Sequence, residues 1–262
     1  MGIAIEYDWV KPKIVGVTMK RAHEMNTLTH ELLDELDGVL KHAIREKARV
    51  IIITGSGRAF CCGAHLKYFS NTLTSEIDGG FDVRDNYLAK IAKLFDRIEK
   101  LPIPVIAAIN GYALGGGFEL ALACDFRVMS KSAQIGLPEV KLGATPGAGG
   151  VQKLQKFCGR GRALEWILRA SRIGWKDAER AGLICSATEP DELMLHAITI
   201  AEDLCRYSPR AIAQCKASVH LAGSVDAHSA MQYGIEALSL LVGSSDWREG
   251  MAAFIEKRDP IF

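Results

Sequence analysis

Two glutamates stand in apolar surroundings beside glycine-rich turns. Glu119 lies in the run GGGFEL over 115–120, and Glu139 follows Pro138 between two apolar stretches. Burial disfavours a charged carboxyl group and raises its pKa toward the range in which it exchanges protons at neutral pH. Each glutamate alone has a simpler interpretation, as a charge at a helix N-terminus for Glu119 and as a loop carboxylate capping Lys141 for Glu139. Together, the two carboxylates predict general acid–base chemistry.

Two glycine-rich turns each follow a predicted buried strand. The first is GSGRAFCCGAHLK over 55–67, and the second is NGYALGGGFEL over 110–120. Glycine lets a backbone turn sharply and lets another group approach closely. In the second turn the glycines also open a helix, whose free amide groups and positive dipole end suit an anion or a developing oxyanion.

Other catalytic glycine loops are absent from the sequence. Neither turn fits GxGxxG, because Phe60 and Leu120 occupy the sixth position, and there is no GxxxxGK[ST]. GxSxG and HExxH are also missing, and no cysteine–histidine group has zinc-ligand spacing. These absences exclude a dinucleotide loop, a phosphate loop, a serine-hydrolase elbow and a zinc site.

The composition is that of an ordinary globular protein. The 262 residues carry a formal net charge of +1, and 48% of them are hydrophobic, which argues against bulk electrostatic binding of nucleic acid and against disorder. The seven cysteines show no disulfide framework, so we expect buried free thiols in a reducing compartment. The N-terminus lacks a signal-peptide layout, and the apolar stretch 103–124 is interrupted by Asn110 and Glu119. A cytoplasmic protein with no membrane span is the expectation.

Hydrophobic periodicity places these motifs in an α/β fold. Strands and helices alternate through the first half of the chain, whereas the rest is mostly helical, with a composition shift near residue 205. We predict strands at 3–7, 13–19, 50–54, 105–109 and 126–130, helices at 30–44 (capped by Thr29), 86–100, 118–123, 159–170, 175–182, 190–207, 208–222, 226–242 and 246–257, and a polar loop at 70–85.

Taken together, these segments resemble the crotonase superfamily, the enoyl-CoA hydratase/isomerase family. The likeness runs over nearly the whole chain and keeps the family's spacings. It rests on Arg21–Leu28 with Asn26, Gly63-Ala64, Gly115–Leu120, Pro138-Glu139, Pro146–Gly150 and the segment Ala253–Arg258. The resemblance implies a crotonase-like ββα spiral core over residues 1–204, which carries the CoA-thioester site, and a C-terminal helical trimerisation region over 205–262.

The resemblance also implies the roles of individual residues. The backbone amides of Ala64 and Gly116 would form an oxyanion hole for a thioester carbonyl, and Gly147 matches a backbone position near the catalytic water. Glu119 would take the proton of that water, and Glu139 would protonate the α-carbon. The implied contacts to coenzyme A or substrate are Arg21, Ala22, His65, Leu66 and Lys67, with Phe254 and Lys257 reaching the coenzyme A of a neighbouring subunit.

The implied activity is reversible syn addition of water to a 2-enoyl-CoA through a stabilised enolate. No metal or separate cofactor is expected, because coenzyme A is part of the substrate, and the implied partner is a second copy of the chain, as a trimer or a dimer of trimers. An isomerase, a hydratase of cyclic or aromatic acyl-CoA thioesters, and a non-catalytic or RNA-binding homologue are the alternatives. Retention of both glutamates favours hydration over these. His65 departs from the aspartate usual in the family, and the 70–85 segment is longer than in short-chain hydratases.

Overall fold

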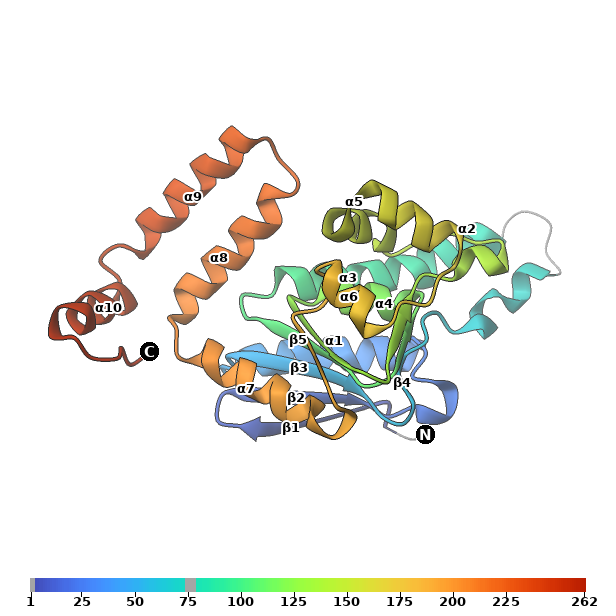
Figure 1. The fold of residues 1–262 in the computed structure, drawn as a ribbon, viewed down its shortest axis with the longest axis horizontal. Helices are drawn as coiled ribbons and strands as arrows, with labels where there is room; N and C mark the ends of the chain where they lie inside the picture. Colours follow the sequence, from blue (N-terminus) through green and yellow to red (C-terminus); the bar gives the residue numbers. More distant parts are fainter. Residues whose placement is uncertain (1–2, 74–78) are drawn as a thin grey trace.

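Two sheets form the centre of the computed structural model, which describes residues 3–73 and 79–262 (Figure 1). The larger sheet has the strand order β1-β2-β3-β5-β7-β9, and the smaller has the order β4-β6-β8. The strands of the larger sheet are β1 (Ile5–Lys11), β2 (Ile14–Met19), β3 (Val50–Gly55), β5 (Val105–Ile109), β7 (Phe126–Ser130) and β9 (Ser186–Thr188). Those of the smaller sheet are β4 (Ala59–Cys61), β6 (Tyr112–Leu114) and β8 (Gln134–Gly136).

The chain winds between the two sheets as a spiral. β1 and β2 pair antiparallel, and every later pairing in both sheets is parallel. Each long strand is followed within a few residues by a short one, so β3 leads to β4, β5 to β6 and β7 to β8. The two glycine-rich turns are the corners where the chain leaves the small sheet.

Helices connect the successive turns of this spiral. The α-helices are α1 (His30–Arg45), α2 (Gly79–Val83), α3 (Ala89–Lys100), α4 (Gly116–Ala123), α5 (Gly150–Leu168), α6 (Trp175–Arg180), α7 (Leu193–Cys205), α8 (Pro209–Ala222), α9 (Ala227–Leu241) and α10 (Ser245–Glu256). A π-helical segment covers Arg84–Leu88, and short 3₁₀ segments cover Ala22–Glu24, Leu66–Leu73, Glu139–Leu142 and Pro190–Glu192. The predicted cap of α1 is confirmed, because the Thr29 hydroxyl accepts a hydrogen bond from the Leu32 amide at 3.2 Å.

Both faces of the larger sheet are covered at β2, β3 and β5, which explains the continuous apolar character of these strands. Ile51 and Ile53 on β3 point into the main core, whereas Val50 and Ile52 pack against α7 in a second, smaller core. Helix α7 lies across one face of the sheet, in contact with β2, β3, β5 and β7, and Figure 1 shows it on the side away from α4 and α5. A strand buried on both faces cannot alternate apolar and polar residues, so it reads as an unbroken apolar run.

Helix α4 is buried on all sides and carries one charged residue, Glu119. Every residue from Gly117 to Ala123 is buried. A helix that is apolar all round belongs in a core. Burying a carboxylate there is costly unless polar groups surround it, so its retention requires partners.

Several predicted elements differ in the structure. The polar loop predicted over 70–85 is wrong for its described part, because 3₁₀, α- and π-helical turns cover Leu66–Leu73 and 79–88; residues 74–78 lie outside the described residues. The helix predicted at 159–170 begins at Gly150 and bends at Gly159, where φ is +76°. The small-sheet strands and β9 were not predicted, because strands of three residues are too short to show a period.

The C-terminal helices α8–α10 extend to one side of the sheets (Figure 1). A buried ion pair joins them to the rest of the protein: the Lys216 ammonium on α8 donates to Asp125 at 2.6 Å and to the carbonyls of Ile98 and Ile103 at 3.1 and 3.0 Å. Large apolar side chains on these helices are exposed, among them Val219, Ile235, Leu238, Leu240, Phe254 and Ile255. Across residues 3–73 and 79–262, no helix has the length and apolar character needed to cross a membrane.

Candidate active site

The two glycine-rich turns meet at the N-terminus of α4. Gly63 has φ of +85°, and a Cβ added to it would lie 2.8 Å from the Gly116 nitrogen. A Cβ added to Gly116 would lie 3.5 Å from the Ala64 nitrogen, so both amides border the same small space. Within residues 3–73 and 79–262, neither amide donates a hydrogen bond to another protein group. Two free amides at one point are the arrangement that stabilises an oxyanion.

Glu119 faces this space from the first turn of α4. Its Oε1 accepts hydrogen bonds from the amides of Ala148 and Gly150 at 2.8 and 2.7 Å. The carboxylate therefore caps the N-terminus of α5, the helix that follows its own. Burial raises its pKa, while the two amides and the nearby Lys153 ammonium act in the opposite direction. Glu119 is thus fixed in place with one oxygen, Oε2, outside these amide contacts.

Glu139 lies beside the same turn, in a 3₁₀ segment that ends at Leu142. Its Oε1 would lie 3.0 Å from a Cβ added to Gly115, so the carboxylate lies directly against this turn, where a φ of +56° favours glycine. Its Oε2 is buried and finds no hydrogen-bond partner among the described residues. Burial first, and the charge of Glu119 second, raise the pKa of Glu139 from its usual 4.5 to about 7. Glu139 is therefore balanced between its acid and base forms near neutral pH.

The structure brings together four of the predicted groups: the amides of Ala64 and Gly116 and the two carboxylates. Gly147 lies next in the chain to Ala148, whose amide donates to Glu119, so the structure places it beside that carboxylate's hydrogen-bond partner. The side-chain Nδ1 of His65 lies 2.8 Å from the Thr27 hydroxyl, which ties the first turn to the 21–28 segment.

The predicted coenzyme A contacts lie in two places. The first place is the 3₁₀ turn Ala22–Glu24, which Arg21 precedes and where the Arg21 guanidinium pairs with the Glu24 carboxylate at 2.7 Å. The same region includes the start of the 3₁₀ segment Leu66–Leu73, where the Leu66 side chain is 62% exposed and Lys67 follows it. Phe254 and Lys257 lie on or after α10, which Figure 1 places at the far end of the chain from α4. Within one chain these two residues do not meet the site.

Sequence reasoning missed the groups that hold the site in place. The amides of Ala148 and Gly150 were missed because the helix was predicted to begin at residue 159. The glycines of 147–150, the kind of cluster that opens α4, were the available signal. Tyr87 was also missed: its hydroxyl accepts from the His65 amide at 2.7 Å and donates to the Leu28 carbonyl at 2.6 Å. In the sequence, Tyr87 has the pattern of an ordinary core residue, so nothing there signals its hydrogen bonds.

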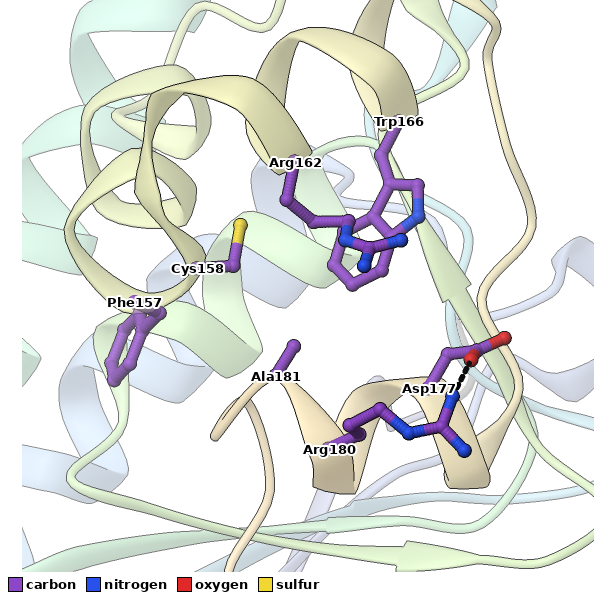
Figure 2. A pocket seen from close by; sticks show the side chains of 7 residues that line it. All are labelled: Phe157, Cys158, Arg162, Trp166, Asp177, Arg180 and Ala181. Atoms are coloured by element: carbon purple, nitrogen blue, oxygen red, sulfur yellow. Dashed lines mark hydrogen bonds and ion pairs between the residues drawn. The ribbon is translucent and has the colours of Figure 1, made fainter.

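The cysteines and a separate pocket stand apart from this chemistry. Cys61 is buried beneath the first turn, and burial raises its pKa to about 12, which leaves an inert thiol. Cys185 and Cys215 are exposed, so the prediction that the thiols are buried is wrong for these two. A cavity of about 310 Å³ lies between α5 and α6 (Figure 2), and none of the site residues lines it. In the part of the chain that the structure describes, no three metal-ligating side chains gather at one point.

The chain belongs to the enoyl-CoA hydratase/isomerase family, whose sequence model matches residues 10–262. It is 37% identical over 248 residues to the short-chain-enoyl-CoA hydratase of Clostridium acetobutylicum, covering 94% of this chain and 92% of that protein. It is 35% identical to the crotonyl-CoA hydratase of Syntrophomonas wolfei, covering 95% and 94%.

A solved structure shows the same architecture. The enoyl-CoA hydratase of Bacillus anthracis superposes with a TM-score of 0.91 at 38% identity, covering 99% of this chain and 98% of that one. The predicted crotonase-like α/β fold is therefore confirmed, and the chain is an enzyme of this family.

Proposed function

We propose that this protein hydrates a 2-enoyl-CoA reversibly to a 3-hydroxyacyl-CoA. The observation that carries the proposal is the convergence of two carboxylates and two free amides on one space. Hydration needs a base for water, an acid for the α-carbon and a receptor for enolate charge, and these groups supply all three. Relatives at 35–37% identity bear the names short-chain-enoyl-CoA hydratase and crotonyl-CoA hydratase.

The proposed reaction proceeds by syn addition of water across the double bond. The thioester oxygen accepts hydrogen bonds from the amides of Ala64 and Gly116. Glu119 removes a proton from the water as its oxygen bonds to the β-carbon, and the π electrons move toward the carbonyl oxygen to give an enolate. Glu139 then delivers its proton to the α-carbon. Each amide donor contributes roughly 3 kcal/mol to the lowering of the barrier, as oxyanion-hole donors do in other enzymes.

The two carboxylates are suited to these roles by their surroundings. Glu119 is held by amides that favour its charged form, as a base requires, whereas Oε2 of Glu139 has no such partner among the described residues. Coenzyme A would run along 21–28 and 64–67, where Arg21, Ala22, His65, Leu66 and Lys67 line its path. The backbone of Gly147 would lie near the water.

The test is turnover of crotonyl-CoA by the wild type, Glu119→Gln and Glu139→Gln, followed through loss of the enoyl-thioester absorbance. We expect each variant to lose about 10²-fold or more in kcat, because each removes one proton-transfer group. Gly38→Ala on the exposed face of α1 is the control. Wild-type protein that moves the double bond of a 3-enoyl-CoA but adds no water to crotonyl-CoA would replace this proposal with isomerisation.

We further propose that the chain forms a homo-oligomer through α9 and α10. These helices expose more large apolar side chains than the surface of a monomeric protein usually does. A second subunit that covers them would bring Phe254 and Lys257 to its own active site. Ile255→Glu on α10 should reduce the sedimenting mass to that of a smaller species. Leu195→Glu, an equally exposed position on α7, should leave the mass unchanged; loss of assembly in both variants would contradict this interface.

A further inference from the structure

We propose that Tyr87 is a positioning residue that fixes the Ala64 amide toward the thioester oxygen. The inference rests on the hydratase function proposed above. Tyr87 touches neither carboxylate by hydrogen bond, and it lies in the π-helical segment Arg84–Leu88 that leads into α3. Its hydroxyl is buried with the ring, which is 2% exposed.

The hydroxyl of Tyr87 links two backbone groups that face each other. It accepts a hydrogen bond from the His65 amide at 2.7 Å and donates one to the Leu28 carbonyl at 2.6 Å. The amide of Leu28 in turn donates to the Gly63 carbonyl at 2.9 Å. Both peptide units that flank Ala64 are therefore tied to Leu28, the first directly and the second through Tyr87.

These two ties determine where the Ala64 amide points. The Gly63 carbonyl and the Ala64 amide belong to one trans peptide unit, so they point in opposite directions. Because Leu28 holds the carbonyl, the amide must point away from Leu28. One hydrogen bond still lets the peptide unit rock about its own axis. The tie on the following peptide, through Tyr87, removes that freedom.

The hydroxyl reinforces a contact between backbones. Leu28 and Ala64 form an isolated parallel bridge, in which the Leu28 carbonyl faces the amide that follows Ala64. The Tyr87 hydroxyl bonds both of these groups, so it adds a side-chain link across the bridge. Ring contacts with His30 and Tyr68, at centroid distances of 5.4 and 4.8 Å, fix the tyrosine from the side.

The π-helical segment supplies the residue at the required place. A π turn inserts one residue into a helix and rotates the side chains before it relative to those after it, and such turns are frequent at functional sites. The rotation allows Tyr87 to reach the 63–65 turn while Ile91, Leu94 and Phe95 on α3 stay in the core. A purely structural role for Tyr87 would affect stability alone, which separates the two possibilities.

The experiment compares Tyr87→Phe with the wild type in two measurements. We expect kcat for crotonyl-CoA to fall by about 10- to 100-fold with KM changed less than about threefold, because a displaced oxyanion donor weakens the transition state more than the bound substrate. We also expect bound cinnamoyl-CoA, whose absorbance moves to longer wavelength when its carbonyl is polarised, to show a smaller shift in the variant.

The matched control is Tyr68→Phe, a neighbouring tyrosine whose hydroxyl accepts from the His30 amide at 3.3 Å. It should keep the wild-type kcat and spectral shift. All proteins are assayed at a temperature at which circular dichroism shows them folded.

A Tyr87→Phe variant with wild-type kcat and shift and only a lower melting temperature would overturn the inference. If the wild type does not hydrate crotonyl-CoA, the proposed function fails, and the cinnamoyl-CoA spectrum still decides the role of Tyr87. An unchanged shift in the variant would then refute that role, and a reduced shift would support it.

Discussion

Glu119 and Glu139 are chemically identical side chains that the fold places in different environments. Glu119 accepts two short amide hydrogen bonds that favour its charge, and these oppose the effect of burial. Glu139 lies near the charge of Glu119, and one of its oxygens has no partner in the described residues. Environments that push two pKa values apart assign the base and the acid of a pair.

The pH dependence of kcat/KM should be bell-shaped. Activity should fall as the pH drops toward the pKa of Glu119, which burial raises above 4.5, because the base becomes protonated. It should also fall as the pH rises through about 7, because Glu139 loses the proton that it delivers. The two limbs belong to the coupled pair. Rates measured between pH 4.5 and 9 check this, and an activity that rises steadily to pH 9 would contradict the acid role of Glu139.

Stability should also respond to Glu139. Its pKa is higher in the folded protein than in the unfolded chain, so between pH 4.5 and about 7 the folded state binds more protons and stability falls as pH rises. Glu139→Gln removes this penalty. We expect it to raise the free energy of unfolding at pH 8 by on the order of 1–3 kcal/mol, with little change at pH 4. Urea unfolding at both pH values measures the difference, and an equal gain at both would point to another cause.

At the scale of elements, the site depends on the close approach of the α4 backbone to the β4 backbone, which requires a glycine at the contact. A Cβ added to Gly117 would lie 1.9 Å from the Cys61 carbonyl oxygen, so α4 could not stay against β4. The two oxyanion turns are side by side because α4 and β4 are in contact at this point.

Gly117→Ala should therefore displace α4 and lose more than about 2 kcal/mol of stability together with activity. Gly38→Ala is the matched control, because a Cβ there meets nothing within 4 Å in the middle of α1. It should stabilise the protein by about 0.5–1 kcal/mol with unchanged activity. Thermal melting and crotonyl-CoA turnover check both variants. A folded, active Gly117→Ala protein would show that the contact is dispensable.

Most helices, strands and site residues of this protein could be predicted from the sequence, and the exceptions have physical reasons. Helix α1 has a long, clear helical period, strands β3 and β5 are unbroken apolar runs, and the carboxylates and glycine turns were all identified. The start of α5 was misplaced because Gly147–Gly150 looks like a loop until the Glu119 carboxylate is seen to cap it. Tyr87 carries no local signal, because its role depends on a turn more than twenty residues away.

At the scale of the whole molecule, one buried cation joins the C-terminal helices to the sheets. The Lys216 side chain is 8% exposed, and Asp125, its partner, also accepts from the Val105 amide at 2.7 Å. No comparable ion pair is this deeply buried on both sides among residues 3–73 and 79–262. The orientation of α8 therefore depends on this contact.

Lys216→Met should leave the Asp125 carboxylate buried without its cation and cost about 3–5 kcal/mol. Amide hydrogen exchange should rise across 209–222 in particular, since α8 loses its attachment. The control is Lys131→Met, which breaks an exposed ion pair with Glu189 and should change little. Exchange measured by mass spectrometry checks both variants, and unchanged protection of α8 would show that apolar contacts alone hold the helix.

The winding of the chain also determines the order in which the site can appear during synthesis. Ala64, Gly116 and Glu139 each leave the small sheet on a different pass, and the amides that hold Glu119 come later still. No nascent fragment that ends before residue 150 contains all the parts, however stable its own strands are. Contacts between segments far apart in the chain cost loop-closure entropy before they contribute stability, so the site should form late in folding. An incomplete chain on the ribosome would thus carry sheet and helix but no catalytic power.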